Sequence, residues 1–308
     1  MKKLSTVLSS KWFQLLFSAI LIFVAFRKVD VGRLVADISL VPWWVIILLL
    51  AYMFVSMVIG GVRWGVLVLG KLNWADVLAF TRATYAGGFY SLFFPSSVGG
   101  DLLKWTSLMK KYPDISKLKL AGTALIDRVI GFSAFSVVAL VSLILGKSLK
   151  YQFPEILFWL FLGINLSLVV FYTLVFSLDF EKIFGRFKFL KKLLEIVDLL
   201  KNSNKKRILI CFFISVLCEP LWMATTWFIS LVFGGGLNLL QVLIFMPIIS
   251  LVLVLPISWA GFGARENLYL IFFGQLGVPA EKLLLISAFG GVMGILNSLL
   301  GGLILLIR

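Results

Sequence analysis

Long apolar runs, separated by short stretches rich in lysine and arginine, dominate the pattern of hydrophobic and polar positions along this chain. A helix needs about 20 apolar residues to cross the hydrocarbon core of a bilayer, and most of the runs approach that length. The pattern therefore predicts a series of membrane-embedded helices. The expected segments are Trp12–Phe26, Pro42–Leu69, Val77–Phe94, Leu118–Leu145, Pro154–Leu178, Ile208–Phe233, Leu239–Leu255 and Leu283–Ile307.

Two of these apolar regions are interrupted by similar phrases that combine proline, glycine and a charged end. The first is Pro95-Ser-Ser-Val-Gly-Gly-Asp101, and the second runs from Pro256 to Glu266. Proline removes a backbone donor and glycine loosens a helix, so hydrocarbon tolerates such a break only where protein or trapped water satisfies the backbone. We expect each phrase to form the tip of a hairpin. The tip residues are Pro95, Gly99, Gly100, Pro256, Gly261 and Gly263.

The basic loops set the expected topology, because cytoplasmic loops carry an excess of lysine and arginine. Residues 102–120 hold five lysines against a single acid, and residues 179–207 hold nine basic residues. With Lys2, Lys3 and Lys11 in the cytoplasm, the first helix runs outward and Pro42–Leu69 returns, so a complete crossing by Val77–Phe94 would put the five-lysine loop outside. The conflict disappears if residues 77–108 and 239–273 are re-entrant hairpins. Eight simple crossings with a weak charge bias are the alternative.

The predicted fold is an all-α, polytopic integral membrane protein with about six full transmembrane helices and two re-entrant hairpins. Helix, hairpin and helix occur twice with opposite orientation, as in inverted-repeat transporters, whose sites lie at the repeat interface. We expect a single transmembrane domain over residues 1–308, with repeat 1 at about 42–145 and repeat 2 at about 208–307. A cytoplasmic amphipathic connector is expected at about 179–207, and both termini should be cytoplasmic.

Within that connector, the stretch from Phe184 to Leu200 has the pattern of an interfacial helix. Its leucines and Val197 recur at helical spacing, while lysines and acids face elsewhere. Such a helix suits the surface of an anionic leaflet. A solvated connector is the alternative, although the phenylalanines of the stretch argue against it.

Composition supports the membrane assignment and removes several kinds of chemistry. The chain is 61% hydrophobic, well above the roughly 45–50% of soluble domains. Its formal net charge of +15 resides largely in short loops, where lipid headgroups rather than nucleic acid are the expected partners. The sequence has no histidine, which excludes imidazole relays and His-based triads. Cys211 and Cys218 lie too far apart for a disulfide, so we expect packing residues, with no cofactor and no metal site.

Charged residues inside the apolar runs are the candidates for function. Each costs roughly 2.5–3.5 kcal/mol at a helix centre, so such residues usually face an interior or a cavity. Arg63 fits ligand contact and a snorkelling arginine equally well. Asp127 and Arg128 are neighbours on one helix and do not face each other. We therefore expect Asp127 to pair with another cation, such as Arg63 or Arg82.

Glu219 lies near the middle of its apolar run and is the expected proton-coupling or gating acid, with a pair to Arg265 as the alternative. Arg265 and Glu266 follow the second tip, where a helix N-terminus would favour an anion. The predicted substrate-binding residues are Arg63, Arg82, Lys104, Arg128 and Arg265. The predicted gating or proton-coupling residues are Asp101, Asp127, Glu219 and Glu266.

Several of these charged motifs occur together in one known family. They are Arg63-Trp64, Pro95-x-x-x-Gly-Gly-Asp101 followed by Lys104, Asp127-Arg128 and the phrase Pro256–Glu266. In this combination the chain resembles the flippase-like transmembrane region of lysylphosphatidylglycerol synthases and their stand-alone YbhN-type relatives, over nearly its whole length. Gly261-x-Gly-x-Arg-Glu266 is the most specific part. Where this chain has Gly100-Asp101 and Lys104, family members commonly show Glu or a similar residue and Arg. Where it has Asp127-Arg128, they often show Glu-Arg. This chain therefore keeps the charge type at these positions.

The resemblance implies movement of a lipid with a polar head between leaflets, in the full-length synthases an aminoacylated phosphatidylglycerol. Related regions also accompany polyprenyl-phosphate glycosyltransferases. The synthases carry a soluble C-terminal transferase domain, which we expect this chain, ending at Arg308, to lack.

We therefore expect a flippase or transporter, not an enzyme, in the plasma or inner cell membrane. Its expected partners are lipids with anionic or phosphate headgroups, including polyprenyl-phosphate-linked lipids, and a membrane glycosyltransferase. The alternatives are a membrane-embedded lipid-phosphate transferase and a non-transporting partner of a glycosyltransferase or lipid-modifying enzyme.

Overall fold

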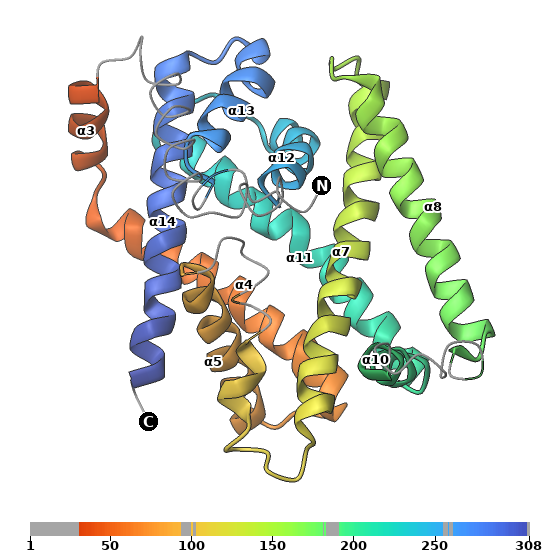
Figure 1. Cartoon of the computed structure of the whole chain (residues 1–308). Helices are drawn as coiled ribbons and strands as arrows, with labels where there is room; N and C mark the ends of the chain where they lie inside the picture. The colour runs from red at the N-terminus through yellow and green to blue at the C-terminus, as the bar shows by residue number, and fades with distance from the viewer. Residues whose placement is uncertain are drawn as a thin grey trace, which may run out of the picture. The chain divides into compact units, whose positions relative to one another are not determined.

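Figure 1 shows the computed structural model of the chain, in which the regular structure of the described residues is helical throughout. The structure describes residues 31–93, 100, 103–180, 182, 191–254, 258 and 261–306. The helices are α3 (Val31–Ser39), α4 (Trp43–Leu69), α5 (Trp74–Ser91), η1 (Lys104–Leu108), α7 (Lys117–Ser148), α8 (Glu155–Ser177), α10 (Lys191–Lys201), α11 (Lys205–Val232), α12 (Leu239–Val254), α13 (Ala264–Phe272), η4 (Gly274–Leu276) and α14 (Ala280–Leu306). Each apolar run from Pro42 onward is a helix whose bounds lie close to the predicted ones.

Five of the described helices are long and apolar enough to cross a membrane, namely α4, α7, α8, α11 and α14. They coincide with five of the six full crossings predicted from the sequence. The remaining crossing, Trp12–Phe26, lies outside the described residues. The chain is therefore an all-α, multi-pass membrane protein, as predicted.

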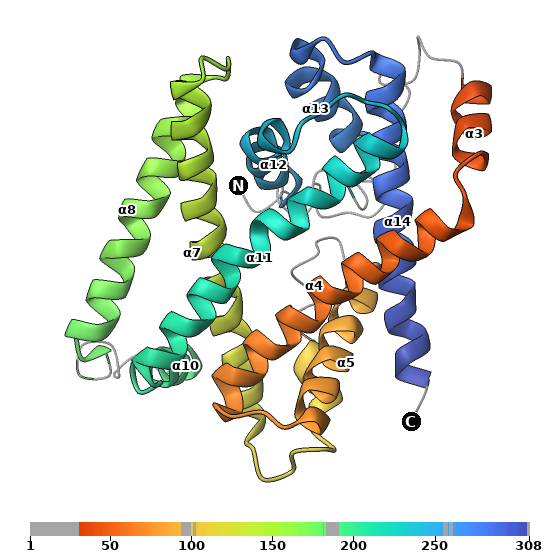
Figure 2. The ribbon, with the colours of Figure 1, turned by 180° about the vertical axis from the view of Figure 1, so that it is seen from behind.

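α7 and α8 form a helix pair whose starts follow local sequence signals. The Ser116 side chain caps α7 by accepting the Lys119 N–H at 3.2 Å. Pro154, with its fixed φ, immediately precedes α8, and Glu155 in the first turn complements the helix dipole. Figures 1 and 2 show the two helices side by side from opposite directions.

The chain divides into two compact units that interleave along the sequence. Unit 1 comprises residues 1–56, 85–101 and 220–308, and unit 2 comprises residues 57–84 and 102–219. The unit boundaries fall within three helices, α4, α5 and α11. In α11 the boundary lies between Glu219 and Pro220, where proline removes a backbone donor inside the helix. Each unit thus takes residues from both predicted repeats. The single domain with two repeats stays a prediction.

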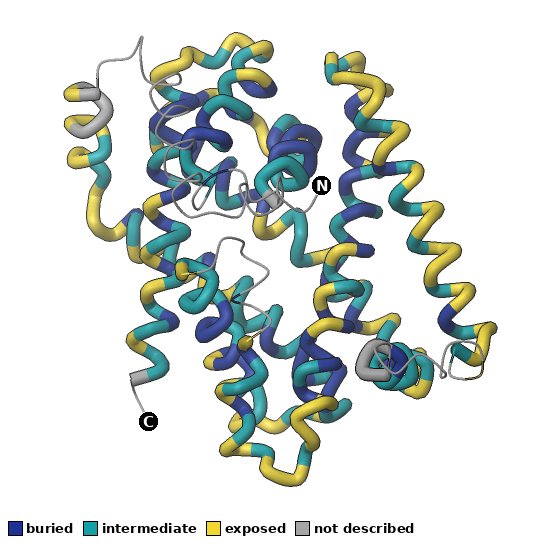
Figure 3. The backbone as a smooth tube through the Cα atoms, in the orientation of Figure 1, coloured by how far each residue is buried: buried dark blue, intermediate teal, exposed yellow. Residues whose placement is uncertain are grey.

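The core of unit 2 forms where α4 and α5 approach closely. A Cβ at Gly61 would lie 2.7 Å from the Thr81 backbone nitrogen, so the two helices can approach this closely only because the residue is glycine. Next to it, the fully buried rings of Trp64 and Phe80 meet edge to face with centroids 5.1 Å apart. Figure 3 shows the buried positions of α4, α5 and α7, whereas α8 is exposed along most of its length.

α10 is the described part of the predicted amphipathic connector. Its Leu194 and Leu200 are buried, and the helix packs against α7 and α8 within unit 2. Gly122 of α7 faces Leu199, whose Cδ1 would lie 2.8 Å from an added Cβ. The apolar face of α10 therefore packs on protein, and its location at a membrane surface stays a prediction.

In unit 2, the chain leaves the start of α5 and returns to it before α7 begins. The Tyr112 hydroxyl donates to Asp76 Oδ1 at 2.7 Å, and Lys111 Nζ donates to the Ala75 carbonyl. Asp76 lies in the first turn of α5, so the chain between these residues begins and ends at one place. This return is compatible with the predicted re-entrant hairpin.

In unit 1, α12 and α13 lie within a similar excursion. Lys282, in the first turn of α14, donates to the carbonyl of Gly234, which precedes α12. The rings of Phe233 and Phe289 also meet edge to face, 5.3 Å apart. The choice between two hairpins and eight simple crossings stays a prediction. The membrane face from which each hairpin enters stays a prediction.

The hairpin tips are only partly within the described residues. Pro95, Gly99 and Pro256 lie outside them, as does Asp101. Gly100 is buried, and a Cβ there would lie 2.1 Å from the backbone nitrogen of Ser91 at the end of α5. Close packing therefore requires glycine at this point of the first tip.

Candidate functional site

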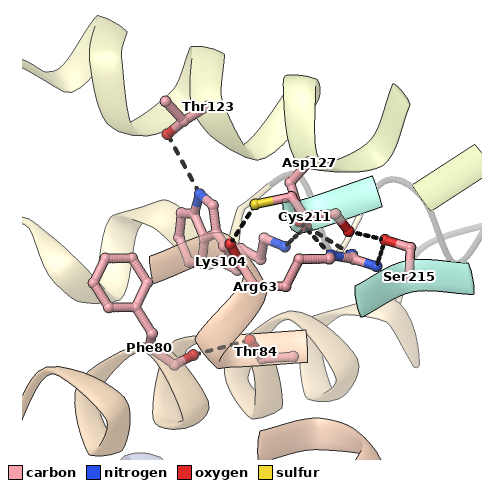
Figure 4. A network of polar contacts seen from close by, with 9 residues as sticks. Arg63, Phe80, Thr84, Lys104, Thr123, Asp127, Cys211 and Ser215 are labelled. Atoms are coloured by element: carbon pink, nitrogen blue, oxygen red, sulfur yellow. Dashed lines mark hydrogen bonds and ion pairs between the residues drawn. The ribbon is translucent and has the colours of Figure 1, made fainter. Parts of the chain in front are cut away.

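Three predicted site residues meet inside unit 2, namely Arg63 of α4, Lys104 of η1 and Asp127 of α7 (Figure 4). The Arg63 guanidinium holds the Asp127 carboxylate with two atoms, Nε at 2.7 Å from Oδ1 and Nη2 at 3.1 Å from Oδ2. Lys104 Nζ donates to the same Oδ2 at 2.9 Å. Asp127 is 1% exposed and Lys104 3% exposed. Of the two partners predicted for Asp127, Arg63 is the one that pairs with it in the structure.

The neighbours of this ion-pair cluster satisfy its remaining polar groups. Arg63 Nη1 donates to Ser215 Oγ at 2.9 Å, and Ser215 in turn donates to the Cys211 carbonyl at 2.8 Å. The Cys211 thiol donates to the Arg63 carbonyl at 3.3 Å, and both cysteines are free. Lys104 Nζ lies 4.6 Å from the ring centroid of Trp64. Every side-chain nitrogen of the half-buried Arg63 and the buried Lys104 therefore has a protein partner, which is the arrangement of a structural ion pair.

Glu219 lies near this cluster on α11, where its carboxylate interacts electrostatically with Arg63 and Arg128. Arg128 is exposed whereas Asp127 is buried, which confirms that these two neighbours face different ways. Arg82 is exposed on α5, and the hydrogen bonds of Asp127 to described residues come from Arg63 and Lys104 instead. The structure thus brings Glu219 and Arg128 close to the cluster and leaves Arg82 apart. A gating role for Glu219 stays a prediction.

A second charged site lies in unit 1 at the start of α13. Gly263 precedes the helix with φ of 79°, a left-handed conformation that glycine adopts at little cost. Glu266 turns back toward it, and its Oε2 accepts the Gly263 N–H at 2.6 Å, as in a capping box. Its Oε1 accepts the hydroxyl of Ser287 from α14 at 3.0 Å. Glu266 is 1% exposed, and both of its oxygens are engaged within the protein.

The Arg265 guanidinium lies beside Glu266 without sharing these bonds. Its Nη2 is 3.9 Å from Glu266 Oε1, which is longer than a hydrogen bond. Its Cζ lies 5.3 Å from the ring centroid of Phe262. Both Nε and Nη2 are buried and have no hydrogen-bond acceptor among the described residues. Since buried polar groups are nearly always bonded, this edge of the guanidinium is suited to a further acceptor.

Gly291 of α14 provides the space that the guanidinium occupies. A Cβ at this position would lie 2.1 Å from Arg265 Nη2 and 3.1 Å from the end of the Phe262 ring. The backbone of α14 thus approaches the charged group more closely than any side chain would allow. A substitution here would displace Arg265.

Sequence reasoning did not find several of these contacts. It grouped Glu266 with the gating acids, and the Gly-x-x-Glu spacing at a helix start was the available signal for its capping bond. Gating by Glu266 stays a prediction. Ser287 and Gly291 carry no such signal, because their part in the site depends on how α14 packs against α13. Ser215 was missed for the same kind of reason on α11.

Comparison with known proteins gives one match. The family model for the lysylphosphatidylglycerol synthase TM region matches residues 11–301. No curated protein and no solved structure matches the chain. The matched residues include both hairpin phrases and both charged sites.

Proposed function

Because the chain belongs to the family of lysylphosphatidylglycerol synthase transmembrane regions, we propose that it is a lipid flippase that moves a lipid with an anionic, phosphate-bearing headgroup between leaflets. The family suggests a function connected with membrane lipid, and the chain is a multi-pass membrane protein. Its basic loops support a location in the cell membrane with cytoplasmic termini. The proposal treats the protein as a transporter and not as an enzyme.

The observation that carries this proposal is the Nε and Nη2 edge of Arg265. In Arg63 the same two atoms hold a carboxylate at hydrogen-bonding distance. The two free oxygens of a phosphate diester fit this fork in the same bidentate way. The start of α13 adds the partial positive charge of a helix N-terminus beside the guanidinium.

Release of the headgroup requires another partner for Arg265. Glu266 is the nearest carboxylate, with Oε1 3.9 Å from Nη2. A small movement of the guanidinium toward this oxygen would replace the phosphate by an internal ion pair. In the proposed cycle Glu266 therefore stabilises the site after the lipid leaves. Glu219, with its charged neighbours Arg63 and Arg128, would be the acid that couples protons to this exchange.

Reconstitution of the purified chain in liposomes tests the proposal. Fluorescent phosphatidylglycerol in the outer leaflet is bleached by dithionite, and the protected fraction reports leaflet exchange, with and without a pH gradient. We expect faster exchange of this lipid than of fluorescent phosphatidylcholine. Arg265→Gln should slow exchange by roughly 10- to 100-fold, because it removes a pair of charge-assisted hydrogen bonds.

The matched control removes a cation that the site does not use. Lys147 forms an exposed ion pair with Glu155 at 3.6 Å, so Lys147→Gln should leave exchange unchanged. Exchange at the protein-free rate for every lipid class would contradict transport and favour a non-transporting partner of a lipid-modifying enzyme. Formation of a modified lipid from a supplied donor would favour the transferase instead.

A further inference from the structure

A groove in unit 2 lies outside both charged sites. It is bounded by α7, α8 and the first half of α11, and its volume is about 360 Å³. Most of its lining is apolar, with Val137, Leu168 and Leu209 as representatives of the three helices. Phe161 and Val175 are the buried residues of α8, so most of this helix is open to its surroundings. In a membrane those surroundings are lipid.

The groove has the length and the interior of a site for a hydrocarbon chain. It extends along α8 from Phe176 to Asn165, eleven residues apart, or about 16 Å at the rise of an α-helix. The Tyr172 and Ser133 hydroxyls and the Asn165 amide N–H groups are bonded to protein. Tyr172 and Ser133 share a hydrogen bond of 3.2 Å, and the Asn165 amide donates to the Ser136 carbonyl at 3.0 Å. The groove therefore offers little polar competition to an acyl chain.

One end of the groove carries a positive charge. Lys205, the first residue of α11, lines this end, and its Nζ lies 5.3 Å from the ring centroid of Phe176. It is exposed, and among the described residues no carboxylate forms an ion pair with it. Lys201 of α10 donates to the Leu178 carbonyl at the end of α8. Figures 1 and 2 show that α10 and the start of α11 lie at the end where α8 finishes.

We propose that this groove binds an anionic glycerophospholipid, with one acyl chain along α8 and its phosphate against Lys205. The charge at the mouth and the hydrocarbon lining match the two ends of such a molecule, and basic pockets between transmembrane helices are a recognised site for anionic headgroups. The groove lies entirely within unit 2 and shares no residue with the Arg265 site. Its lipid is therefore a bound companion of the protein and not the transported one.

The test uses the full chain in phosphatidylcholine nanodiscs. A small fraction of phosphatidylglycerol carries a photoreactive diazirine in the middle of one acyl chain, and adducts are mapped by peptide mass spectrometry. We expect adducts on the groove faces of α8 and α11. Val169→Trp fills the groove and should reduce labelling at least about tenfold, the loss expected when about two methylene groups are displaced. Val170→Trp is the matched control, since Val170 is similarly exposed, 56% against 63%, and does not line the groove.

The headgroup end is tested by a second matched pair. Lys205→Gln should reduce the preference for phosphatidylglycerol over a phosphatidylcholine probe about fivefold, whereas Lys206→Gln, outside the groove, should not. Equal labelling of the Val169 and Val170 variants would overturn the proposal. Equal labelling by the two lipids in the unaltered protein would also overturn it, and cross-links between two copies of the chain would make a second copy the occupant. Since Arg265 takes no part, failure here leaves the proposed transport function untouched.

Discussion

Arg63 in unit 2 and Arg265 in unit 1 each lie beside a carboxylate that is 1% exposed, but the two carboxylates are used differently. Asp127 accepts bonds from Nε and Nη2 of Arg63 and from Lys104, so its charge is matched entirely by cations. Glu266 accepts the N–H of Gly263 and the hydroxyl of Ser287, both of them neutral donors. The same edge of the guanidinium is therefore bonded in unit 2, whereas in unit 1 it has no acceptor within the part of the chain that the structure describes. The partners of the carboxylate oxygens, and not the number of charges, distinguish the structural ion pair at Arg63 from the proposed binding site at Arg265.

The position of each acid along its helix explains the difference. Asp127 lies well inside α7, where the backbone N–H groups are already bonded within the helix, so only side chains can satisfy its oxygens. Glu266 lies in the first turn of α13, where backbone N–H groups have no partner within the helix. One of its oxygens therefore caps the helix and is withdrawn from Arg265. The position of the acid, inside its helix for Asp127 and in the first turn for Glu266, therefore separates the closed site from the open one.

The largest expected effect comes from breaking the closed site. Asp127→Asn leaves the buried Lys104 and the half-buried Arg63 without this counter-charge and should lower the free energy of unfolding by about 3–5 kcal/mol. Denaturant unfolding in detergent micelles measures this change. Glu155→Gln, which breaks the exposed pair with Lys147, is the control and should cost no more than about 1 kcal/mol. Equal costs for the two variants would remove the distinction between the sites.

A smaller but more selective effect is expected from filling the space beside Arg265. Gly291→Ala places a Cβ where the guanidinium lies, and the flexible side chain can move away at little cost. We expect leaflet exchange of phosphatidylglycerol to fall roughly tenfold, the equivalent of one lost charged hydrogen bond, with stability changed by less than about 1 kcal/mol. Gly294→Ala is the control, because nothing lies within 4 Å of its added Cβ. If both variants exchange lipid equally well, the position of Arg265 does not matter for transport.

Ser287→Ala should partly convert the open site into a closed one. Loss of the hydroxyl frees Glu266 Oε1, which can then bind Arg265 Nη2 and compete with the lipid phosphate. We expect leaflet exchange to fall about 3- to 10-fold. Ser215→Ala removes the matching hydroxyl from the closed site and should leave exchange unchanged while costing about 1 kcal/mol of stability. Faster exchange in the Ser287 variant would contradict the competition between carboxylate and phosphate.

The smallest effect is expected at a third polar contact, the one between Tyr112 and Asp76, which lies outside the long apolar helices. The Tyr112 hydrogen bond, aided by the Asn73 amide, holds the pKa of the Asp76 carboxyl below its usual value. Its stabilisation is therefore present above the usual carboxyl pKa of about 4 and is lost as pH falls through the lowered value. Burial, together with the bond to Asp76, raises the pKa of the Tyr112 hydroxyl. The stabilisation from Tyr112 is therefore present below the usual tyrosine pKa of about 10 and is lost as pH rises through the raised value.

Thermal unfolding measured from pH 2 to pH 11 tests these two pH dependences of stability. Tyr112→Phe should lower Tm between these limits and lose both pH-dependent contributions, and its effect on Tm should be smaller than that of Asp127→Asn. Parallel profiles for the variant and the unaltered protein would show that the contact does not contribute.

The helices were predictable from the sequence because the length of an apolar run is a local property, as the agreement for α4 and α8 illustrates. The hairpins could be predicted only indirectly, from the charges of the loops. The contact of Tyr112 with Asp76 shows that the chain returns to the start of α5. Much of the candidate site was beyond sequence reasoning. The space at Gly291 exists only because α13 packs against α14, and no pattern in either segment records that packing.

The central claim is that Arg63 stabilises the fold and Arg265 binds lipid phosphate. Unfolding free energies of Arg63→Gln and Arg265→Gln, with and without phosphatidylglycerol, test it most directly. Both variants would also carry Val169→Trp so that the groove of unit 2 does not contribute. We expect Arg63→Gln to lower the free energy of unfolding by about 3–5 kcal/mol, while phosphatidylglycerol still stabilises the variant. Arg265→Gln should be as stable as the parent without lipid and gain nothing from it. An Arg265→Gln protein that is strongly destabilised yet still stabilised by phosphatidylglycerol would contradict the account.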